Sequence, residues 1–377
     1  AALWISVPAR AEPPEAQAAR LGARAAEQAA EAESELPPPE LTLDVWRVPV
    51  TRPYDVPAAD MIRLGVEQEL PSPAERAAKR HAAQLRGAAQ RADGRGRQRA
   101  LGLRLAHARA ELQQVEASHR VHQQHLALAE RTLALAQARH AAGGSLADAT
   151  QAEIEVARAQ AEVAGDAARA ESAAQVVSTL RAGGGGEADA TGERPELLAL
   201  RLSREAELES ARAEQARSGW PDFRVGASYF APTTGRDEHG FGVTLGMKLP
   251  WLWGARSGRA RAAESRAQAL EAERSAKQRD LRADAAVTRG QLRAAQSRLR
   301  VTRARTLPLV ERSQKLAAAN YEAAGGKLED TLRAEALRLE VEMEVVQLEA
   351  EIAHLKLDMA YLEAGTAARS EETKHVH

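Results

Sequence analysis

Two aspartates at equivalent positions after two glycine pairs are the side chains of this sequence that could form a charged site together. Asp148 follows the glycine pair 143–144, and Asp330 follows the pair 325–326. Carboxylates just past a turn could attract cations or pair with basic side chains. The basic side chains nearby are Arg139, Lys327 and Arg333. The alternative is a structural role, because a carboxylate in the first turn of a helix is stabilised by the helix dipole.

Three histidines of one predicted helix have the spacing of possible metal ligands. His119, His122 and His125 are each three residues apart, so the first and third point about 240° apart around the helix. All three therefore cannot share one face, and we expect solvated histidines and no metal site. The chain has no Cys, which excludes disulfides, thiol catalysis and cysteine metal sites.

The rest of the sequence offers no catalytic or cofactor-binding motif. It contains no nucleophile–base pair, phosphate-binding loop, dinucleotide fingerprint or zinc motif. The net charge is −1, and the charged residues, 28% of the chain, are interspersed in sign, which is not typical of a protein that binds polyanions. We therefore predict no enzyme, no cofactor and no nucleic-acid partner.

Long helices must position the two aspartates. Aromatic residues are 3% of the chain, too few for two ordinary globular cores, and the Ala, Leu, Glu, Arg and Gln that dominate are typical of long helices. We expect a helical hairpin at 74–182 that turns at Gly143-Gly144, and a second at 254–365 that turns at Gly325-Gly326. Pro308 should kink the second hairpin near Thr306.

Two β-hairpins are predicted, at 41–70 and 222–250. In the second, apolar residues alternate with glycine or polar residues, and we expect the apolar ones to face lipid. They are Phe223, Val225, Tyr229, Phe241, Val243, Leu245 and Met247. Each strand is about 10 residues long, enough for a tilted strand to cross a bilayer. The alternative is a small sandwich with its apolar faces inward. We favour the membrane because no further strands are available to complete such a core.

The chain carries this set of elements twice, about 180 residues apart. We predict a first repeat at 1–182, a Gly-rich linker at 183–192, a second repeat at 193–365 and a tail at 366–377. Four strands leave sheet edges that lipid cannot satisfy, so the sheet must close with other copies. Three copies give a ring of about 12 strands, an even number in the known range. Before the first repeat, Ala9-x-Ala11 could end a signal peptide.

Several short segments, in the order in which they occur along the chain, match a known protein family. The chain resembles the TolC-like outer-membrane efflux proteins, the exit ducts of tripartite pumps and type I secretion systems. The matching segments are Arg194-Pro195-Glu196-Leu197, Trp220-Pro221-Asp222-Phe223, Leu249-Pro250 followed by Gly254, Leu307-Pro308, Arg139-His140 and Tyr321 before the two turns, and Leu362-Glu363-Ala364-Gly365. The sequence departs from the family at His140, where Tyr is common, and in having two glycines per turn. Trp251 and Trp253 are consistent with an interfacial aromatic belt.

The resemblance implies a mainly α fold with a small β part: duplicated long helical hairpins forming an α-barrel, and four strands contributed to a trimeric 12-stranded outer-membrane β-barrel. It implies a homotrimer in outer-membrane lipid with a long periplasmic portion, an inner-membrane transporter and a periplasmic adaptor (membrane fusion protein). The adaptor would dock at the tip formed by Gly143, Gly144, Ser145, Leu146, Gly325, Gly326 and Leu328. The aperture gate would comprise Asp148, Asp330, Arg139, Lys327 and Arg333. The alternative is a soluble periplasmic coiled-coil adaptor or scaffold.

Overall fold

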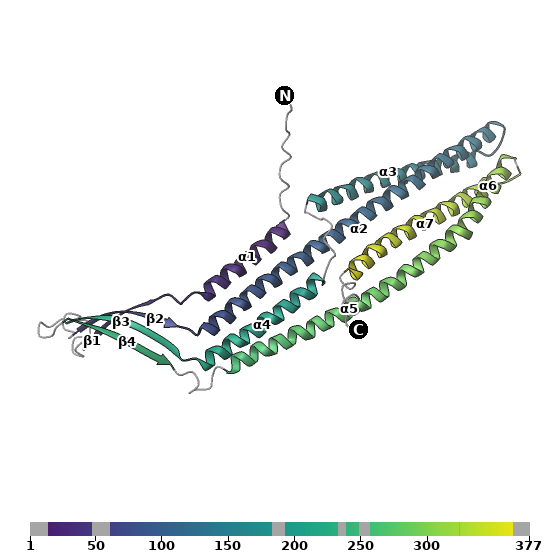
Figure 1. The fold of residues 1–377 in the computed structure, drawn as a ribbon. Helices are drawn as coiled ribbons and strands as arrows, with labels where there is room; N and C mark the ends of the chain where they lie inside the picture. The colour runs from purple at the N-terminus through teal and green to yellow at the C-terminus, as the bar shows by residue number, and fades with distance from the viewer. Residues whose placement is uncertain are drawn as a thin grey trace, which may run out of the picture. The chain divides into compact units, whose positions relative to one another are not determined.

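The computed structural model describes residues 14–46, 61–182, 193–232, 239–248, 257–323 and 325–364. The elements in chain order (Figure 1) are α1 (Pro14–Ser34), β1 (Glu40–Trp46), β2 (Met61–Leu70), α2 (Pro73–Ala141), α3 (Leu146–Ala182), α4 (Pro195–Gly219), β3 (Asp222–Pro232), β4 (Gly240–Lys248), α5 (Ser257–Val301), a π-helix (Thr302–Thr306), α6 (Leu307–Glu322) and α7 (Leu328–Glu363). The predicted fold class, mainly α with a small β part, is confirmed. The predicted linker at 183–192, the tail at 366–377, Trp251, Trp253 and Ala9-x-Ala11 lie outside the described residues.

The chain divides into two compact units, and each draws on both predicted repeats. The first, here called the helical unit, comprises Ala1–Ala16, Arg95–Arg194 and Arg279–His377. The second, the sheet unit, comprises Gln17–Gly94 and Pro195–Gln278. The helices α2 and α5 contribute residues to both units. No helix in the described part of the chain combines the length and apolar character needed to cross a membrane.

The sheet unit holds one antiparallel sheet of four strands in the order β1-β2-β3-β4 (Figure 1). The register places Leu43 opposite Leu64, Leu64 opposite Tyr229, and Tyr229 opposite Phe241. Because side chains alternate along a strand, this register gathers most apolar residues of the four strands on one face.

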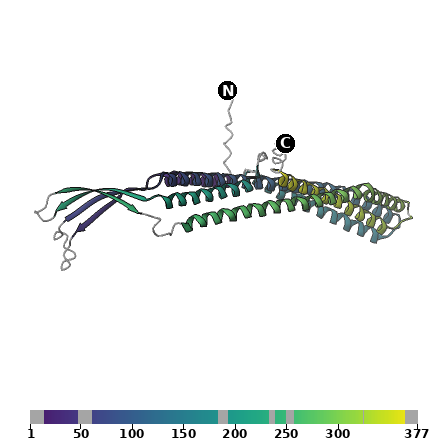
Figure 2. The ribbon, with the colours of Figure 1, turned by 60° about the horizontal axis from the view of Figure 1, so that its bottom comes forward.

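Small side chains allow the helices of the helical unit to pack closely. The buried residues where α2 meets α3 include Ala129, Ala136, Ala152 and Ala159, and Ala costs least in a helix. The two views in Figures 1 and 2 both place α3 alongside the end of α2, and α7 alongside α6. The predicted helical hairpins are therefore present, each reversing at its glycine pair.

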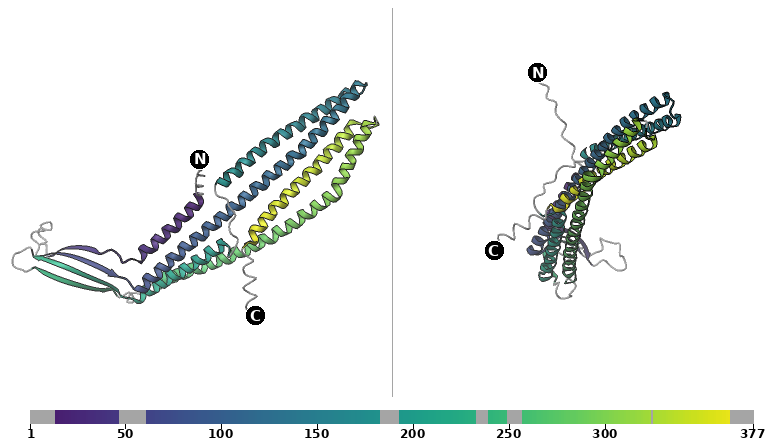
Figure 3. Two further views of the ribbon diagram at one scale, coloured as in Figure 1. Left: turned by 45° about the horizontal axis from the view of Figure 1, so that its top comes forward. Right: turned by 90° about the vertical axis from the view of Figure 1, so that its right-hand side faces the viewer.

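The predicted kink before Pro308 appears as a π-helix at Thr302–Thr306. The N–H of Leu307 donates to the carbonyl of Thr302, five residues earlier, which is the π-helical pattern. Pro308 follows at the start of α6, where its missing N–H and its ring disturb the preceding turn. The helix changes direction in this region (Figure 3).

Candidate functional site

Both turns of the helical unit depend on their glycines. In the first, Gly143 has a φ of +96°, and the N–H of Gly144 donates to the carbonyl of Arg139 at 2.8 Å. A Cβ on Gly144 would lie 2.8 Å from that oxygen. In the second, the N–H of Gly326 donates to the carbonyl of Asn320 at 2.9 Å, and a Cβ there would lie 3.0 Å from the carbonyl carbon of Asn320. The reversals therefore exclude larger side chains at Gly144 and Gly326.

A buried cluster lies behind the turns and joins the two hairpins. It contains Ala136 and Ala152 from the first hairpin and Tyr321 and Leu328 from the second. The guanidinium carbon of Arg139 lies 4.2 Å from the ring centroid of Tyr321, in a cation–π arrangement. A basic residue of the first predicted turn is thus held by an aromatic residue of the second.

The two turns differ in what they expose. Leu146 begins α3 and is 63% exposed, whereas Leu328 begins α7 and is 2% exposed. Ser145 and Lys327, which precede them, are both exposed. Leu146 of the first turn is therefore accessible to a partner, whereas Leu328 of the second turn is buried in the core of its own chain.

Within the described residues of one chain, the predicted gate carboxylates make no ion pair. Asp148 is half-buried and Asp330 is exposed. Arg333 pairs with Glu329 at 3.0 Å, and Arg139 lies over the tyrosine ring. A pairing that closes an aperture through these carboxylates would have to reach another copy of the chain.

The prediction of solvated histidines is wrong for His122. Its Nδ1 lies 2.6 Å from a carboxylate oxygen of Asp166, which is fully buried, and the other oxygen lies 2.7 Å from a guanidinium nitrogen of Arg169. The carboxylate of Asp166 on α3 provides the imidazole of His122 with a buried hydrogen-bond partner. His119 and His125 are half-buried. No group of three or more His, Asp or Glu side chains in the described part of the chain is arranged to hold a metal ion.

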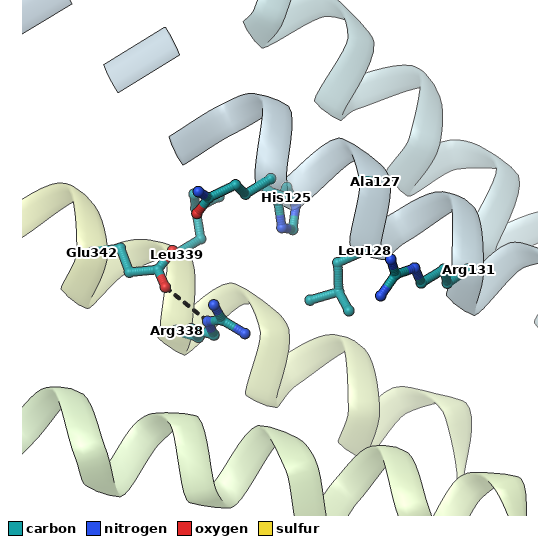
Figure 4. Close-up of a pocket in the computed structure, with 8 residues that line it drawn as sticks. His125, Ala127, Leu128, Arg131, Arg338, Leu339 and Glu342 are labelled. Carbon is teal, nitrogen blue, oxygen red and sulfur yellow. Dashed lines mark hydrogen bonds and ion pairs between the residues drawn. The ribbon is translucent and has the colours of Figure 1, made fainter. Parts of the chain in front are cut away.

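A cavity of about 270 Å³ lies between α2 and α7 in the helical unit (Figure 4). The first of these helices lines it with His125, Leu128 and Arg131, and the second with Arg338 and Glu342. Nε of Arg338 donates to Glu342 at 2.8 Å. Burial lowers the pKa of His125 below its usual value. At neutral pH the cavity therefore presents an uncharged imidazole beside guanidinium groups.

A buried carboxyl group links the same two helices. Glu335 is 2% exposed, and its carboxyl oxygen accepts a hydrogen bond from the hydroxyl of Thr132 at 2.8 Å. Burial raises the pKa of Glu335, and the Thr132 hydrogen bond offsets part of the increase. This pair could not be predicted from the sequence, because the two residues are far apart in the chain and meet only through helix packing.

The strand residues predicted to face lipid share one face of the sheet, and most are exposed. The exposed fractions are 89% for Phe241, 84% for Val243 and 73% for Leu245. Phe223 is half-buried. The first β-hairpin continues the same surface with Leu41 at 70% and other apolar residues. An apolar face of this extent, left open to solvent in a single chain, is typical of an interaction surface.

The opposite face of the sheet carries a ladder of charges. Arg63 lies 3.5 Å from Asp44 and 3.2 Å from Glu67, and Arg224 lies 3.4 Å from Glu67 and 2.9 Å from Glu69. Three of the four pairs cross from β1 to β2 or from β2 to β3 and so brace neighbouring strands, whereas Arg63–Glu67 lies within β2. This ladder was not among the predictions, although opposite charges at alternating positions in two predicted strands are a detectable signal.

Comparison with known sequences gives a match in the second half of the chain. Residues 188–357 match the family described as outer membrane efflux protein. A search of curated protein sequences gave no match.

Comparison with solved structures extends the likeness to nearly the whole chain. VceC, an outer membrane protein of Vibrio cholerae, is 20% identical with a TM-score of 0.74, and the match covers 94% of each chain. The outer-membrane channel OprN is 17% identical with a TM-score of 0.76, covering 94% of this chain and 87% of OprN. The open state of the MtrE outer membrane channel of Neisseria gonorrhoeae is 17% identical with a TM-score of 0.72, covering 94% and 87%. The chain therefore has the fold of these proteins, and the predicted TolC-like resemblance is confirmed.

Proposed function

Because residues 188–357 match the outer membrane efflux protein family and the fold of outer membrane channels extends over nearly the whole chain, we propose that this protein is the outer-membrane channel of a tripartite efflux or type I secretion system. In this proposal it is a passive exit duct across the periplasm and the outer membrane. It has no motif for an energy-yielding reaction, so an inner-membrane transporter supplies the energy.

The observation that carries the proposal is the exposed apolar face of the sheet. Exposure of Phe241, Val243 and Leu245 to water costs free energy, whereas contact with lipid does not. The sheet also ends in two edges, β1 and β4, whose backbone groups cannot stay unpaired in lipid. Three copies joined edge to edge would satisfy both edges and give about 12 strands.

The turn end of the helical unit supports the second part of the proposal, docking of a periplasmic adaptor. Leu146 is an exposed apolar side chain beside exposed Gly143, Gly144 and Ser145. This short surface suits the apolar face of a helical hairpin from a partner. Around it, Asp148 and Asp330 of three chains would form the acidic rings of the aperture.

The test compares two single substitutions on opposite faces of β4. Val243→Arg places a charge on the apolar face, which costs about 2–4 kcal/mol at the middle of a bilayer, whereas a lumen-facing substitution is tolerated. We expect wild type and Thr244→Arg to reach the outer membrane and run as detergent-resistant trimers on an unboiled gel. Val243→Arg should do neither.

Planar bilayers complete this test, because trimers of the wild type should form conducting channels. A soluble, monomeric wild-type protein would support the alternative of a periplasmic adaptor or scaffold and would overturn the proposal. Equal behaviour of the two arginine variants would contradict the assignment of the apolar face to lipid.

A further inference from the structure

A second cavity, of about 470 Å³, lies in the sheet unit where the strands meet the helices. It is lined by the end of α1, the start of α2, the end of α4 and the last register pair of β2 and β3, Leu70 and Phe223. Its volume is in the range of small-molecule sites. Neither the turn end nor the predicted gate involves these residues.

Among the described residues that line this cavity, one cationic side chain has a buried nitrogen without a hydrogen-bond partner. The buried Glu75 carboxylate lies 2.9 Å from Nζ of Lys79 and 3.9 Å from Nε of Arg217, so these charges balance each other in part. Arg76 also lines the cavity, and its Nε is buried with no hydrogen-bond acceptor among the described residues. A buried donor without an acceptor is costly, so the Arg76 guanidinium is suited to binding an anion.

One carboxylate that lines the cavity also has no partner among the described residues. Glu69 is held by Arg224 at 2.9 Å, but Glu35, an exposed residue just after α1, makes no side-chain hydrogen bond or ion pair with the described residues. The cavity therefore presents an unpaired cation, Arg76, and an unpaired anion, Glu35. A single ligand that pairs with both would carry both charges.

The apolar wall of the cavity indicates where such a ligand comes from. Leu70 and Phe223 belong to the apolar face of the sheet and are its last residues at the helical end. Trp220 is 41% exposed and contacts Phe223 edge to face, with 5.8 Å between the ring centroids. Exposed tryptophans gather at membrane–water interfaces. The charged cavity thus adjoins the level at which the apolar band ends.

We propose that this cavity binds the headgroup of a zwitterionic aminophospholipid, such as phosphatidylethanolamine. Arg76 would donate to the phosphate, since guanidinium–phosphate hydrogen bonds are charge-assisted. Glu35 would accept from the ammonium group, and the acyl chains would leave past Leu70 and Phe223 along the apolar face. This inference rests on the proposed function, because such a headgroup meets the cavity only if the apolar face lies in a membrane.

The test measures lipid binding to purified, delipidated trimers by native mass spectrometry. The probes are phosphatidylethanolamine, phosphatidylcholine, which has no ammonium N–H, and phosphatidylglycerol, which has no cationic group. We expect phosphatidylethanolamine to bind best. Arg76→Ala should weaken its binding roughly tenfold, the effect of losing one charged hydrogen bond. The control is Arg80→Ala, an exposed arginine on the same helix and outside the cavity.

A second variant tests the ammonium contact. Glu35→Gln should remove the preference for phosphatidylethanolamine over phosphatidylglycerol while leaving the trimer intact, because Glu35 is exposed. Free inorganic phosphate and the chain-free headgroup glycerophosphoethanolamine complete the probes. Neither should displace the lipid at equal concentration, since both lack the chains that cover the apolar wall.

Several results would overturn the inference. One is unchanged lipid binding in Arg76→Ala, and another is equal competition by inorganic phosphate, which would indicate a simple anion site. Loss of the trimer in Arg76→Ala would instead make the cavity a contact between copies. A conducting trimer with no lipid preference would refute this inference alone, whereas a wild type that forms no trimer would refute the proposed function as well.

Discussion

At the scale of single residues, burial between α2 and α7 favours the uncharged forms of two ionisable groups of the helical unit. His125 and Glu335 both have pKa values shifted by burial, the first downward and the second upward. Each shift makes the stability of the fold depend on pH, with opposite sign. His125 stabilises the fold above the usual imidazole pKa, and this contribution is lost as the pH falls through its folded pKa. Glu335 stabilises the fold below the usual carboxyl pKa, and this contribution is lost as the pH rises through its folded pKa.

We expect Glu335→Gln to become more stable relative to the wild type as the pH rises from about 4.5, the usual glutamate value, toward 8. The reason is that Gln keeps the hydrogen-bonded, uncharged state that the carboxyl group loses on ionisation. The measurement is the thermal midpoint of helical circular dichroism in detergent at several pH values. Glu153→Gln is the matched control, since Glu153 is equally far past its own turn and is exposed. Parallel curves for the two variants would contradict the prediction.

At the scale of elements, the two helical hairpins are similar in outline but are fastened differently. In the first, Asp166 of α3 is buried against His122 of α2. Leu348 lies equally far past the second turn and is 2% exposed. The position equivalent to His122 is Ala304, inside the π-helix. A buried carboxylate held by a histidine and an arginine in one repeat thus occupies the place of apolar packing in the other.

Asp166→Ala should lower the free energy of unfolding by about 3 kcal/mol, because removing one partner leaves His122 and Arg169 beside an empty buried site. Hydrogen exchange of the α2 and α3 amides in the purified protein measures the effect. Asp166→Leu, which copies the second repeat, should recover part of the loss. Glu171→Ala, an exposed carboxylate on the same helix, should change the free energy by less than about 0.5 kcal/mol. Equal exchange in Asp166→Ala and Glu171→Ala would refute this account.

The elements themselves could be predicted from sequence because local chemistry decides them. The glycine pairs were detectable since no other residue allows the tight reversals at Gly144 and Gly326. The apolar face of the sheet was visible as alternation in β3 and β4. The partners His122–Asp166 and Arg139–Tyr321 were not detectable, because each joins residues on different helices. Such pairs depend on how one helix slides and rotates against the next, which a single sequence does not determine.

At the scale of the whole molecule, we propose that the exposed Asp330 of three chains lines the closed aperture. It makes no ion pair within the described residues of its own chain, so its charge is available to neighbouring copies. A ring of carboxylates favours cations and can be held together by basic side chains of adjacent chains.

Asp330→Ala should therefore raise the conductance of the trimer in planar bilayers and reduce its preference for cations. Asp148→Ala tests whether the first turn contributes equally. The control is Glu351→Ala, an exposed carboxylate on α7 well beyond the turn. Unchanged conductance in Asp330→Ala would remove this residue from the gate.

The π-helix before α6 also determines the helical phase of an apolar stripe. Val301, Leu309 and Leu316 are all exposed, at 54%, 64% and 59%. A regular α-helix turns about 100° per residue, so a step of seven residues returns to nearly the same side but a step of eight overshoots by about 80°. The step from Val301 to Leu309 is the longer one, and the wider π turn absorbs its additional residue. Thr302–Thr306 thus contains one residue more than a regular α-helix needs over this stretch. If that residue were deleted, a regular α-helix would keep the apolar stripe on one side. Deletion of a residue elsewhere along α5 or α6 would instead rotate one half of the stripe away from the other.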